Sequence, residues 1–494
     1  DYFYSRISIP LYYAYEFLKL KIMKKITPLL AIFLLTFVGN VNSQSDLIVS
    51  PRRLFDTVQD AYGNKFHYSN LSLASTKVIG SGGTTTISAA PTQSCQAGKF
   101  IAHFAPGSIF ANSTAAQTII CQVLQDISGF IISPPTITAN PIHILCNNQS
   151  GGIATAGSIY LYPNFPLNPN QGVIYSQVEK AMKYGINPYL NFPVAIFPQN
   201  NTMYYGYIDV NPNLNWNFNT NSLNINAAKI DFYTAMLHEV THLLGFQSLL
   251  SNSGFSKLGT ANNYFTKYDT YLKDNSGSAV LSAPTTSCYA SNLTYALATY
   301  TMLGTTAGNP VDITVCSNAL KYVSNSNPNP GIHVFTPAVY SLPSSFHHFE
   351  DMCSPTGYTS VCTPTPNSPG NNDLYFVMSN SVNTGSCYVK RYLKEEEKNV
   401  LCDLGYSVSS TYTSSTASGA TVVIDGSNSF KTYTTGACNP TMTIYGANDG
   451  ISNGIYTYIS TTNSYILPLA NLLTNDFPSG VLSVSCVELI TNNA

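Results

Sequence analysis

The chain has 494 residues, of which 44% are hydrophobic and only 9% are charged. Soluble proteins carry about 25% charged residues, so uncharged polar side chains must form most of this protein's surface. The hydrophobic content excludes an intrinsically disordered chain, and the net charge of −2 without a Lys/Arg cluster argues against a nucleic-acid partner.

The first recognisable segment is an export signal. Met23 is followed by two lysines and by an apolar run over residues 28–41. This pattern predicts a secretory signal peptide at 23–43, preceded by an upstream segment, 1–22, that is not part of the native product. A membrane-spanning helix needs about 20 apolar residues, and no stretch reaches that length. We therefore expect a secreted, extracellular or cell-surface protein without a transmembrane span.

All 11 cysteines follow the predicted signal peptide. Export into an oxidising compartment predicts that they form disulfides, and no pair has the CxxC spacing of a thiolate zinc site. Because 11 is odd, one thiol is unpaired or has lost its partner.

After a short, turn-rich N-terminal segment at 44–94, the pattern becomes regular. Alternation of apolar residues predicts strands, and a spacing of three to four residues predicts helices. The elements expected are, in chain order, a strand at 100–104, a helix at 115–127, strands at 142–145 and 157–161, a helix at 178–184 and an Asn-rich loop at 211–226.

A largely buried helix is expected at 227–244, ended by Gly245. Residues 249–346 are loop-dominated, and a charged helix at 391–404 closes the region. A Ser/Thr-rich linker at 409–422 then leads to a β-rich module at 423–494, which we expect to be truncated because it stops without a closing strand.

The residues with the clearest chemistry lie on the helix at 227–244, where 238–242 read His-Glu-Val-Thr-His. Positions i and i+4 share a helix face, so His238 and His242 can converge on one metal ion. Neutral imidazoles suit Zn²⁺, and two of them leave room for a third ligand and a water. Glu239 could take the proton as that water attacks a peptide carbonyl.

The third ligand is less certain from the pattern. A compact metzincin would have His at position 248, where this chain has Ser248, and residues 249–346 contain no Glu for a gluzincin site. Asp269 is one candidate, although a turn position suits an Asp equally well. Spacing favours the His347-His348 pair, which requires an inserted loop of about 100 residues.

Four segments carry a resemblance to a known family: HEVTHLLGF at 238–246, SSFHHFED at 344–351, YFVMS at 375–379 and KRYLKEEEKNVLCDLGY at 390–406. Together they resemble the leishmanolysin-type branch of the metzincin zinc proteases and its secreted bacterial-like relatives. The resemblance covers roughly residues 95–408. It implies an α+β catalytic domain with an active-site helix and a twisted sheet, followed by the partial all-β module.

The resemblance also assigns roles to residues. It implies that His348 is the third zinc ligand, that His347 stands where the family usually has Ser, and that Met378 forms the methionine turn beneath the metal. Glu350 replaces the family's Asp. Leishmanolysin carries a propeptide with an inhibitory cysteine, but residues 44–94 are too short for one, so we expect Cys95 to form a structural disulfide.

The combined prediction is a secreted zinc-dependent endopeptidase that acts on protein or peptide substrates. Zn²⁺ is bound by His238, His242 and His348, with Glu239 as general base. The alternative is a surface adhesin or structural protein on a metzincin-like scaffold, with weak or no catalysis and with surface attachment through the C-terminal module. A further alternative keeps the zinc and takes Asp269 or His347 as third ligand. Substrate preference is not predicted.

Overall fold

The computed structural model describes residues 57–132, 141–160, 174–189, 203–251, 256–258, 265–281, 320–350 and 376–415, apart from short gaps within these ranges. Elsewhere it describes four short strands: β1 (Phe3–Tyr4), which pairs with β20 (Glu488–Leu489), and β18 (Thr457–Ile459), which pairs with β19 (Ser464–Ile466). The predicted signal peptide at 23–43 and most of the predicted linker and β-rich module lie outside the described residues.

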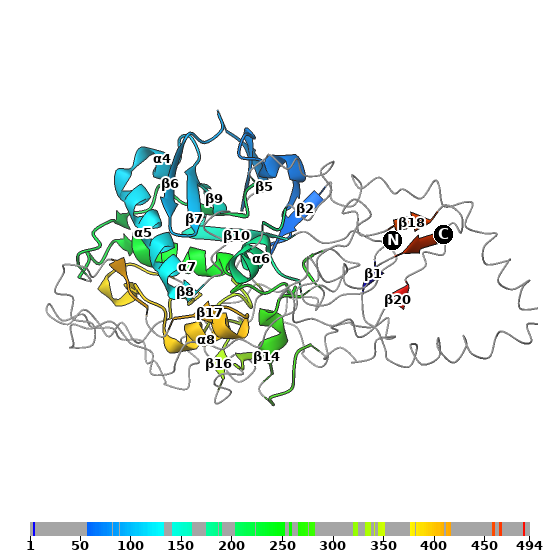
Figure 1. The fold of residues 1–494 in the computed structure, drawn as a ribbon. Coiled ribbons are helices and arrows are strands. Elements are labelled where there is room, and N and C mark those ends of the chain that lie inside the picture. Colours follow the sequence, from blue (N-terminus) through cyan, green and yellow to red (C-terminus); the bar gives the residue numbers. More distant parts are fainter. Residues whose placement is uncertain are drawn as a thin grey trace, which may run out of the picture.

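A seven-stranded mixed sheet forms the centre of the described fold (Figure 1). Its order is β3-β2-β10-β11-β9-β7-β6, and only the β11–β9 and β7–β9 pairs are parallel. The strands are β2 (Thr57–Asp60), β3 (Lys65–His67), β6 (Gln93–Ala97), β7 (Phe100–Phe104), β9 (Ile142–Asn148), β10 (Ala154–Tyr160) and β11 (Gly206–Val210). The strands predicted at 100–104 and 142–145 are confirmed as β7 and part of β9, and the strand predicted at 157–161 is confirmed as far as Tyr160 of β10.

Alternation along the strands gives the sheet one continuous apolar face. Ala102 of β7 lies opposite Ile144 of β9, and Cys146 lies opposite Ile208 of β11. All four side chains are fully or almost fully buried. Because side chains two residues apart point the same way, this face receives the helices that pack on the sheet.

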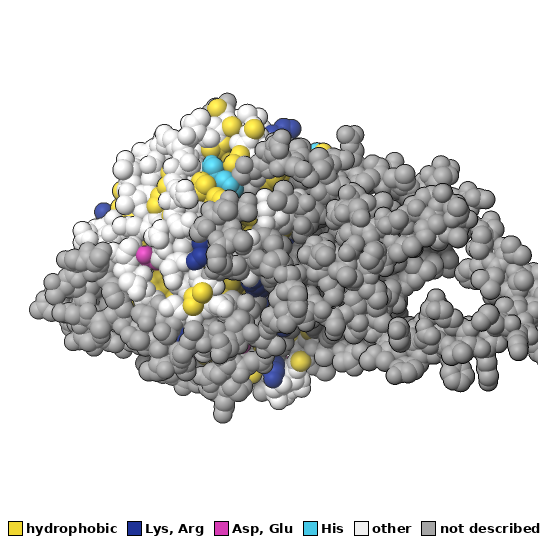
Figure 2. Space-filling view, in the orientation of Figure 1, with side chains coloured by type: hydrophobic (Ala, Val, Ile, Leu, Met, Phe, Trp, Pro, Cys, Tyr) yellow, Lys and Arg dark blue, Asp and Glu magenta, His cyan; other side chains and the backbone are white. Residues whose placement is uncertain are grey.

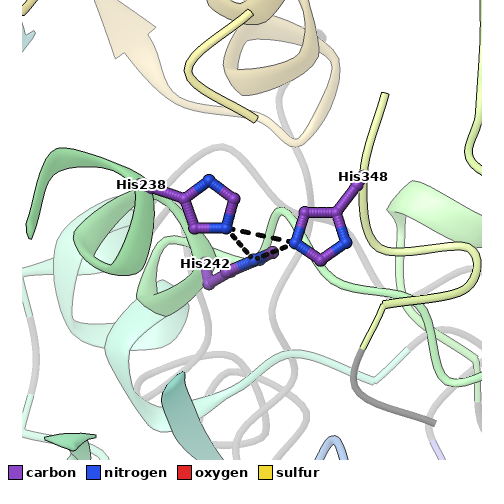
Figure 3. A group of neighbouring side chains, drawn as sticks. All are labelled: His238, His242 and His348. Carbon is purple, nitrogen blue, oxygen red and sulfur yellow. Dashed lines mark hydrogen bonds between the residues drawn. The ribbon is translucent and has the colours of Figure 1, made fainter. Parts of the chain in front are cut away.

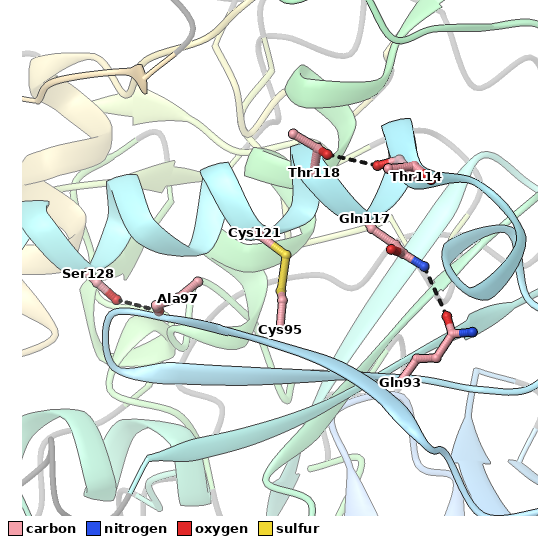
Figure 4. The surroundings of a disulfide bond; sticks show 8 residues. All are labelled: Gln93, Cys95, Ala97, Thr114, Gln117, Thr118, Cys121 and Ser128. Carbon is pink, nitrogen blue, oxygen red and sulfur yellow. Dashed lines mark hydrogen bonds between the residues drawn. A yellow bond between two sulfur atoms is a disulfide. The ribbon is translucent and has the colours of Figure 1, made fainter.

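Helices α5 (Thr114–Phe130) and α7 (Phe232–Leu243) cover this face side by side, with α4 (Ile109–Asn112) leading into α5 (Figure 1). A disulfide between Cys95 of β6 and Cys121 of α5 links the helix covalently to the sheet (Figure 4). Gln117 and Gln93 add a hydrogen bond of 3.1 Å beside it. The predicted helix at 115–127 and the predicted structural disulfide of Cys95 are both confirmed.

Two more cysteines have a defined state. Cys402 is disulfide-bonded, whereas the Cys146 thiol is free and fully buried in the core. Burial raises the pKa of the Cys146 thiol far above its usual range, since a thiolate loses its hydration there. An inert buried thiol agrees with the unpaired cysteine that the odd count predicts.

The opposite face of the sheet is covered by residues from the N-terminal segment. The Tyr207 hydroxyl donates to the Asp60 carboxylate at 2.6 Å. The Ser81 backbone and hydroxyl donate to Asp209 of β11 at 2.7 and 2.9 Å. Ser81 follows β4 (Lys77–Gly80), which pairs with β5 (Gly83–Thr86). The fold is therefore continuous across residue 94, where the sequence predicted the start of the catalytic domain.

The remaining described elements between β2 and Ser415 are short. They are η2 (Tyr68–Leu71), α6 (Gln177–Tyr184), β12 (Trp216–Asn217), β13 (Ile230–Asp231), η4 (Tyr268–Tyr271), β14 (Leu272–Lys273), β15 (Lys321–Tyr322), β16 (Ile332–His333), η6 (Ser386–Tyr388), α8 (Glu395–Asp403), β17 (Ser407–Val408) and β8 (Ile131–Ile132). The pairing of β17 with β8 fastens the end of the α8 segment to the end of α5.

Two predicted helix boundaries are wrong at their N-terminal ends. Helix α7 begins at Phe232 instead of 227, because Ile230 and Asp231 pair with β12. Helix α8 begins at Glu395 instead of 391, because Arg391 is held outside the helix by an ion pair with Asp231. In both cases a long-range contact overrides the local helical spacing.

The described surface carries few charged side chains, as the 9% content of charged residues predicts. Figure 2 shows that the visible described face is mostly uncharged, with scattered Lys, Arg and acidic side chains and no gathered basic patch.

Candidate metal centre

Helix α7, which carries two of the three histidines, is held by defined contacts at both ends. At its start, Asp231 accepts a hydrogen bond from the Thr234 backbone at 3.1 Å and forms an ion pair with Arg391 at 2.6 Å. At its end, Gly245 has a φ of +94°, a conformation that favours glycine and that turns the chain sharply. A Cβ at Gly245 would lie 2.5 Å from the Glu179 side chain. The helix end predicted at Gly245 is therefore confirmed.

His348 reaches the same place from a turn more than 100 residues away in sequence. Phe346 holds a φ of +71°, the only positive value for a non-glycine residue in the described part of the chain. The backbone on either side of the turn is anchored, since Phe335 donates to the His348 carbonyl at 2.8 Å and Phe349 donates to the Met378 carbonyl at 2.7 Å. A strained residue held by such contacts is typical of a functional turn.

His238, His242 and His348 converge on one point (Figure 3). Their Nε2 atoms form a triangle with sides of 3.0, 3.1 and 3.1 Å. The three side chains are between 2% and 7% exposed. The two ligands predicted from the HExxH spacing and the third predicted from the resemblance are thus brought together.

The second nitrogen of each ring fixes its protonation state. Nδ1 of His238 contacts the Val377 carbonyl at 2.6 Å, Nδ1 of His242 contacts the Phe246 carbonyl at 2.8 Å, and Nδ1 of His348 contacts the Ser344 carbonyl at 2.8 Å. A carbonyl can only accept, so each Nδ1 carries the proton and each Nε2 of a neutral ring carries a lone pair. Three lone pairs then face one another with no hydrogen between them.

Protonation cannot relieve this repulsion near neutral pH. Burial lowers the pKa of His238 to about 4 and that of His348 to about 3, and burial lowers the pKa of His242 well below its usual range. The rings are therefore neutral donors aimed at a shared point. This is the arrangement that a cation satisfies.

The donor set fits zinc. Two imidazole nitrogens at about 2.0–2.1 Å from a tetrahedral ion lie about 3.3 Å apart, close to the observed spacing of 3.0–3.1 Å. Three nitrogen ligands leave a fourth position, which is the pattern of catalytic rather than structural zinc sites. The hydrogen bonds from Nδ1 to carbonyls are the outer contacts that usually orient such ligands.

Glu239 lies beside the triad on α7 with one carboxylate oxygen unpaired. It is 5% exposed, and its Oε2 atom has no hydrogen-bond partner. Burial raises the pKa of Glu239 to about 8. A hydrogen bond with the Ala156 backbone favours the ionised form and partly opposes this rise. A bound cation would lower this pKa again. A buried, unpaired carboxylate next to three metal donors can accept and return a proton.

The other two candidates for third ligand have different partners. Both carboxylate oxygens of Asp269 are used, since they accept from the Ser248 hydroxyl at 2.5 Å and from Thr266 at 2.9 Å. His347 lies outside the triad, and its Nε2 contacts the Lys257 ammonium at 2.6 Å. Within the described residues, the structure groups His348 with His238 and His242, and it leaves Asp269 and His347 out of that group.

The turn at Val377–Met378 supports the centre from the α8 side. Its Val377 carbonyl holds the His238 ring, and its Met378 backbone donates to Glu397 of α8 at 2.7 Å. The other Glu397 oxygen caps α8 by accepting from Lys394 at 2.7 Å. The Met378 side chain is fully buried. One carboxylate therefore ties the closing helix to the turn that orients a metal donor.

Sequence reasoning missed one residue beside Glu239. Tyr62, from the turn between β2 and β3, donates to the Ala156 carbonyl at 2.8 Å and stacks on His347 at 5.6 Å between ring centroids. Burial raises the pKa of the Tyr62 hydroxyl well above its usual range, and the charge of the Glu239 carboxylate acts in the same direction. No local signal identifies Tyr62, because the partners of its side chain, Ala156 and His347, lie 94 or more positions away in sequence.

Comparison with known proteins gives no match: no family model matches the sequence, no curated protein matches it, and no solved structure matches the fold. Within the part of the chain that the structure describes, no helix has both the length and the apolar character that a membrane crossing requires.

Proposed function

We propose that this protein is an exported zinc-dependent endopeptidase with a metzincin-like α+β catalytic domain, related to the leishmanolysin type. The observation that carries the proposal is the triangle of Nε2 atoms from His238, His242 and His348, whose tautomers leave three lone pairs directed at one point. Such a centre requires a cation, and three nitrogen donors with an open fourth position favour catalytic zinc.

A bound Zn²⁺ would supply Lewis acidity, which polarises a carbonyl and acidifies a water molecule. Glu239 is the group of this chain placed to accept the proton of that water and to pass it to the leaving amine. Its hydrogen bond with the Ala156 backbone holds the carboxylate at the side of β10 while Oε2 stays unpaired. No covalent intermediate with the protein is needed, so one base and one metal are sufficient.

The surroundings of the site support a rigid centre. Arg391 holds the start of α7, and Glu397 holds the Met378 turn. Both belong to the 390–406 segment, which is part of the resemblance. Met378 is proposed as the methionine of the turn beneath the metal.

The test is casein hydrolysis by the purified mature chain, with and without a zinc chelator. We expect hydrolysis that the chelator removes and that added Zn²⁺ restores. Glu239→Ala and the isosteric Glu239→Gln should both keep the zinc and the fold but lose at least about 100-fold in rate, as expected for loss of a general base. Hydrolysis near the wild-type rate in either variant would refute the assigned role.

The competing proposal is a surface adhesin or structural protein. A folded protein that binds no zinc and cleaves nothing would favour it. The buried Glu239 carboxylate, with its Oε2 atom left without a partner, argues for catalysis, because an adhesin gains nothing from an unsatisfied buried oxygen.

A further inference from the structure

A second polar group borders the triad on the side of His347. The His347 ring centroid lies 6.3 Å from that of His242 and 6.4 Å from that of His348. The Lys257 ammonium contacts Nε2 of His347 at 2.6 Å and the Ser248 carbonyl at 3.2 Å. Lys257 is half-buried and His347 is fully buried. The structure thus places a lysine one side chain away from the metal donors.

Among the residues that the structure describes, this lysine has no carboxylate partner. Burial lowers the pKa of Lys257 to about 7, and the charges of Asp269 and Asp60 oppose this shift from a distance. Asp269 is bonded to Ser248, Leu249 and Thr266. Asp60 is bonded to Tyr207, Asn64 and Tyr62. Neither reaches the ammonium, so the charge of a protonated Lys257 is balanced by no direct ion pair.

An unused hydrogen-bond donor lies next to this lysine. The ring of Tyr340 is 5.9 Å from the Lys257 ammonium and 5.7 Å from the ring of Phe346, the strained residue of the His348 turn. The Tyr340 hydroxyl is buried and has no hydrogen-bond partner. A buried unsatisfied hydroxyl is uncommon and calls for a partner. The Tyr340 hydroxyl therefore lacks an acceptor, and a protonated Lys257 has one N–H left after its contacts with the Ser248 carbonyl and with His347.

We propose that Lys257 and Tyr340 form a subsite for a carboxylate of the peptide substrate, close to the scissile bond. The inference rests on the proposed peptidase function and adds a substrate class, peptides that carry a carboxylate at this position. The carboxylate accepts from the ammonium and from the phenol, and these charge-assisted bonds are stronger than neutral ones. His347 acts as a positioning residue that holds the ammonium.

The carboxylate can come from two sources: an Asp or Glu side chain flanking the scissile bond, or a free C-terminus. Three fluorescent peptides of one sequence separate them. One has Glu beside the scissile bond and an amidated C-terminus, one has Gln and an amidated C-terminus, and one has Gln and a free C-terminus. A site that pairs a charge discriminates strongly against an uncharged isostere.

Binding is measured by fluorescence anisotropy on the zinc-loaded Glu239→Ala chain, so the result does not depend on hydrolysis. We expect one acidic peptide to bind about tenfold or more tightly than the Gln amide. Lys257→Met should remove this preference, and Lys77→Met, at an exposed lysine of the β4–β5 hairpin, should retain it. Tyr340→Phe, which breaks no internal hydrogen bond, should reduce the preference a few-fold.

Equal binding of all three peptides, or no measurable binding of either acidic peptide, would overturn the proposal. So would a preference that survives Lys257→Met. The outcome is separable from that of the peptidase itself. If acidic peptides bind preferentially but the zinc-loaded wild type hydrolyses nothing, the carboxylate subsite stands and the peptidase function is rejected. If the wild type hydrolyses peptides without a preference for acidic ones, the peptidase function stands and the subsite is rejected.

Discussion

The choice between two adjacent histidines is the sharpest test of the metal centre. His348→Ala removes one of three Nε2 donors and leaves two lone pairs that cannot close a tetrahedral site. Structural zinc sites with four ligands bind with about 10–16 kcal/mol, so one ligand is worth about 2.5–4 kcal/mol. We therefore expect zinc affinity to fall by about two to three orders of magnitude in this variant.

His347→Ala is the matched control. It removes the contacts with the Lys257 ammonium and with the Tyr62 ring but leaves all three Nε2 donors in place. Loss of a residue outside the ligand set should cost at most about tenfold in zinc affinity. Because the variant leaves Lys257 with fewer partners, we expect a lower free energy of unfolding that is separate from the zinc result.

The assay is competition for Zn²⁺ with a chromophoric chelator, using only the folded fraction of each variant as judged by circular dichroism. Loss of zinc by His347→Ala and retention by His348→Ala would identify His347 as the third ligand and refute the reasoning from tautomers. Full retention by both variants would show that the triad is not the zinc site at all.

Three further predictions concern the scaffold and are checked by urea unfolding. Gly245→Ala places a Cβ 2.5 Å from the Glu179 side chain at a φ of +94°, so we expect a loss of about 2 kcal/mol or more, and an unchanged midpoint would disprove the strain. Arg391→Met leaves the Asp231 carboxylate buried without its ion pair, which should cost about 3–5 kcal/mol, and a loss below about 1 kcal/mol would contradict that view. Burial raises the pKa of Asp209 to about 7 from 3.8, so its neutral form favours the fold at low pH and that stability is lost as the pH rises through 7. The free energy of unfolding of Asp209→Asn, relative to that of the wild type, should therefore rise by about 2–3 kcal/mol between pH 5 and pH 8.5. A difference between the two proteins that does not change with pH would refute the assignment.

The sequence alone determined the local elements and two of the three histidines of the candidate metal centre. Apolar alternation over 100–104 and helical spacing over 115–127 are properties of neighbouring residues, and β7 and α5 form there. His238 and His242 are paired by the period of the helix that carries them, so their convergence follows as soon as α7 forms.

The order of the strands was not predictable in the same way. Residues 57–67 read as part of a separate N-terminal segment, yet β2 pairs with β10 and extends the sheet. Tyr62 then reaches the side of Glu239 from the turn that follows β2. Nothing near Tyr62 in sequence announces this role, because the contact depends on a strand pairing across about 100 residues.

Tertiary structure also decided between His347 and His348. The two residues are adjacent and chemically identical, so only the resemblance favoured one of them before the fold was known. The positive φ of Phe346 and the anchoring of Phe349 on the Met378 carbonyl direct His348 to the triad, while His347 faces Lys257. Periodicity is a property of neighbouring residues and can be read from the sequence. The direction of a side chain in a turn depends on contacts with residues far along the chain, and only the folded protein supplies them.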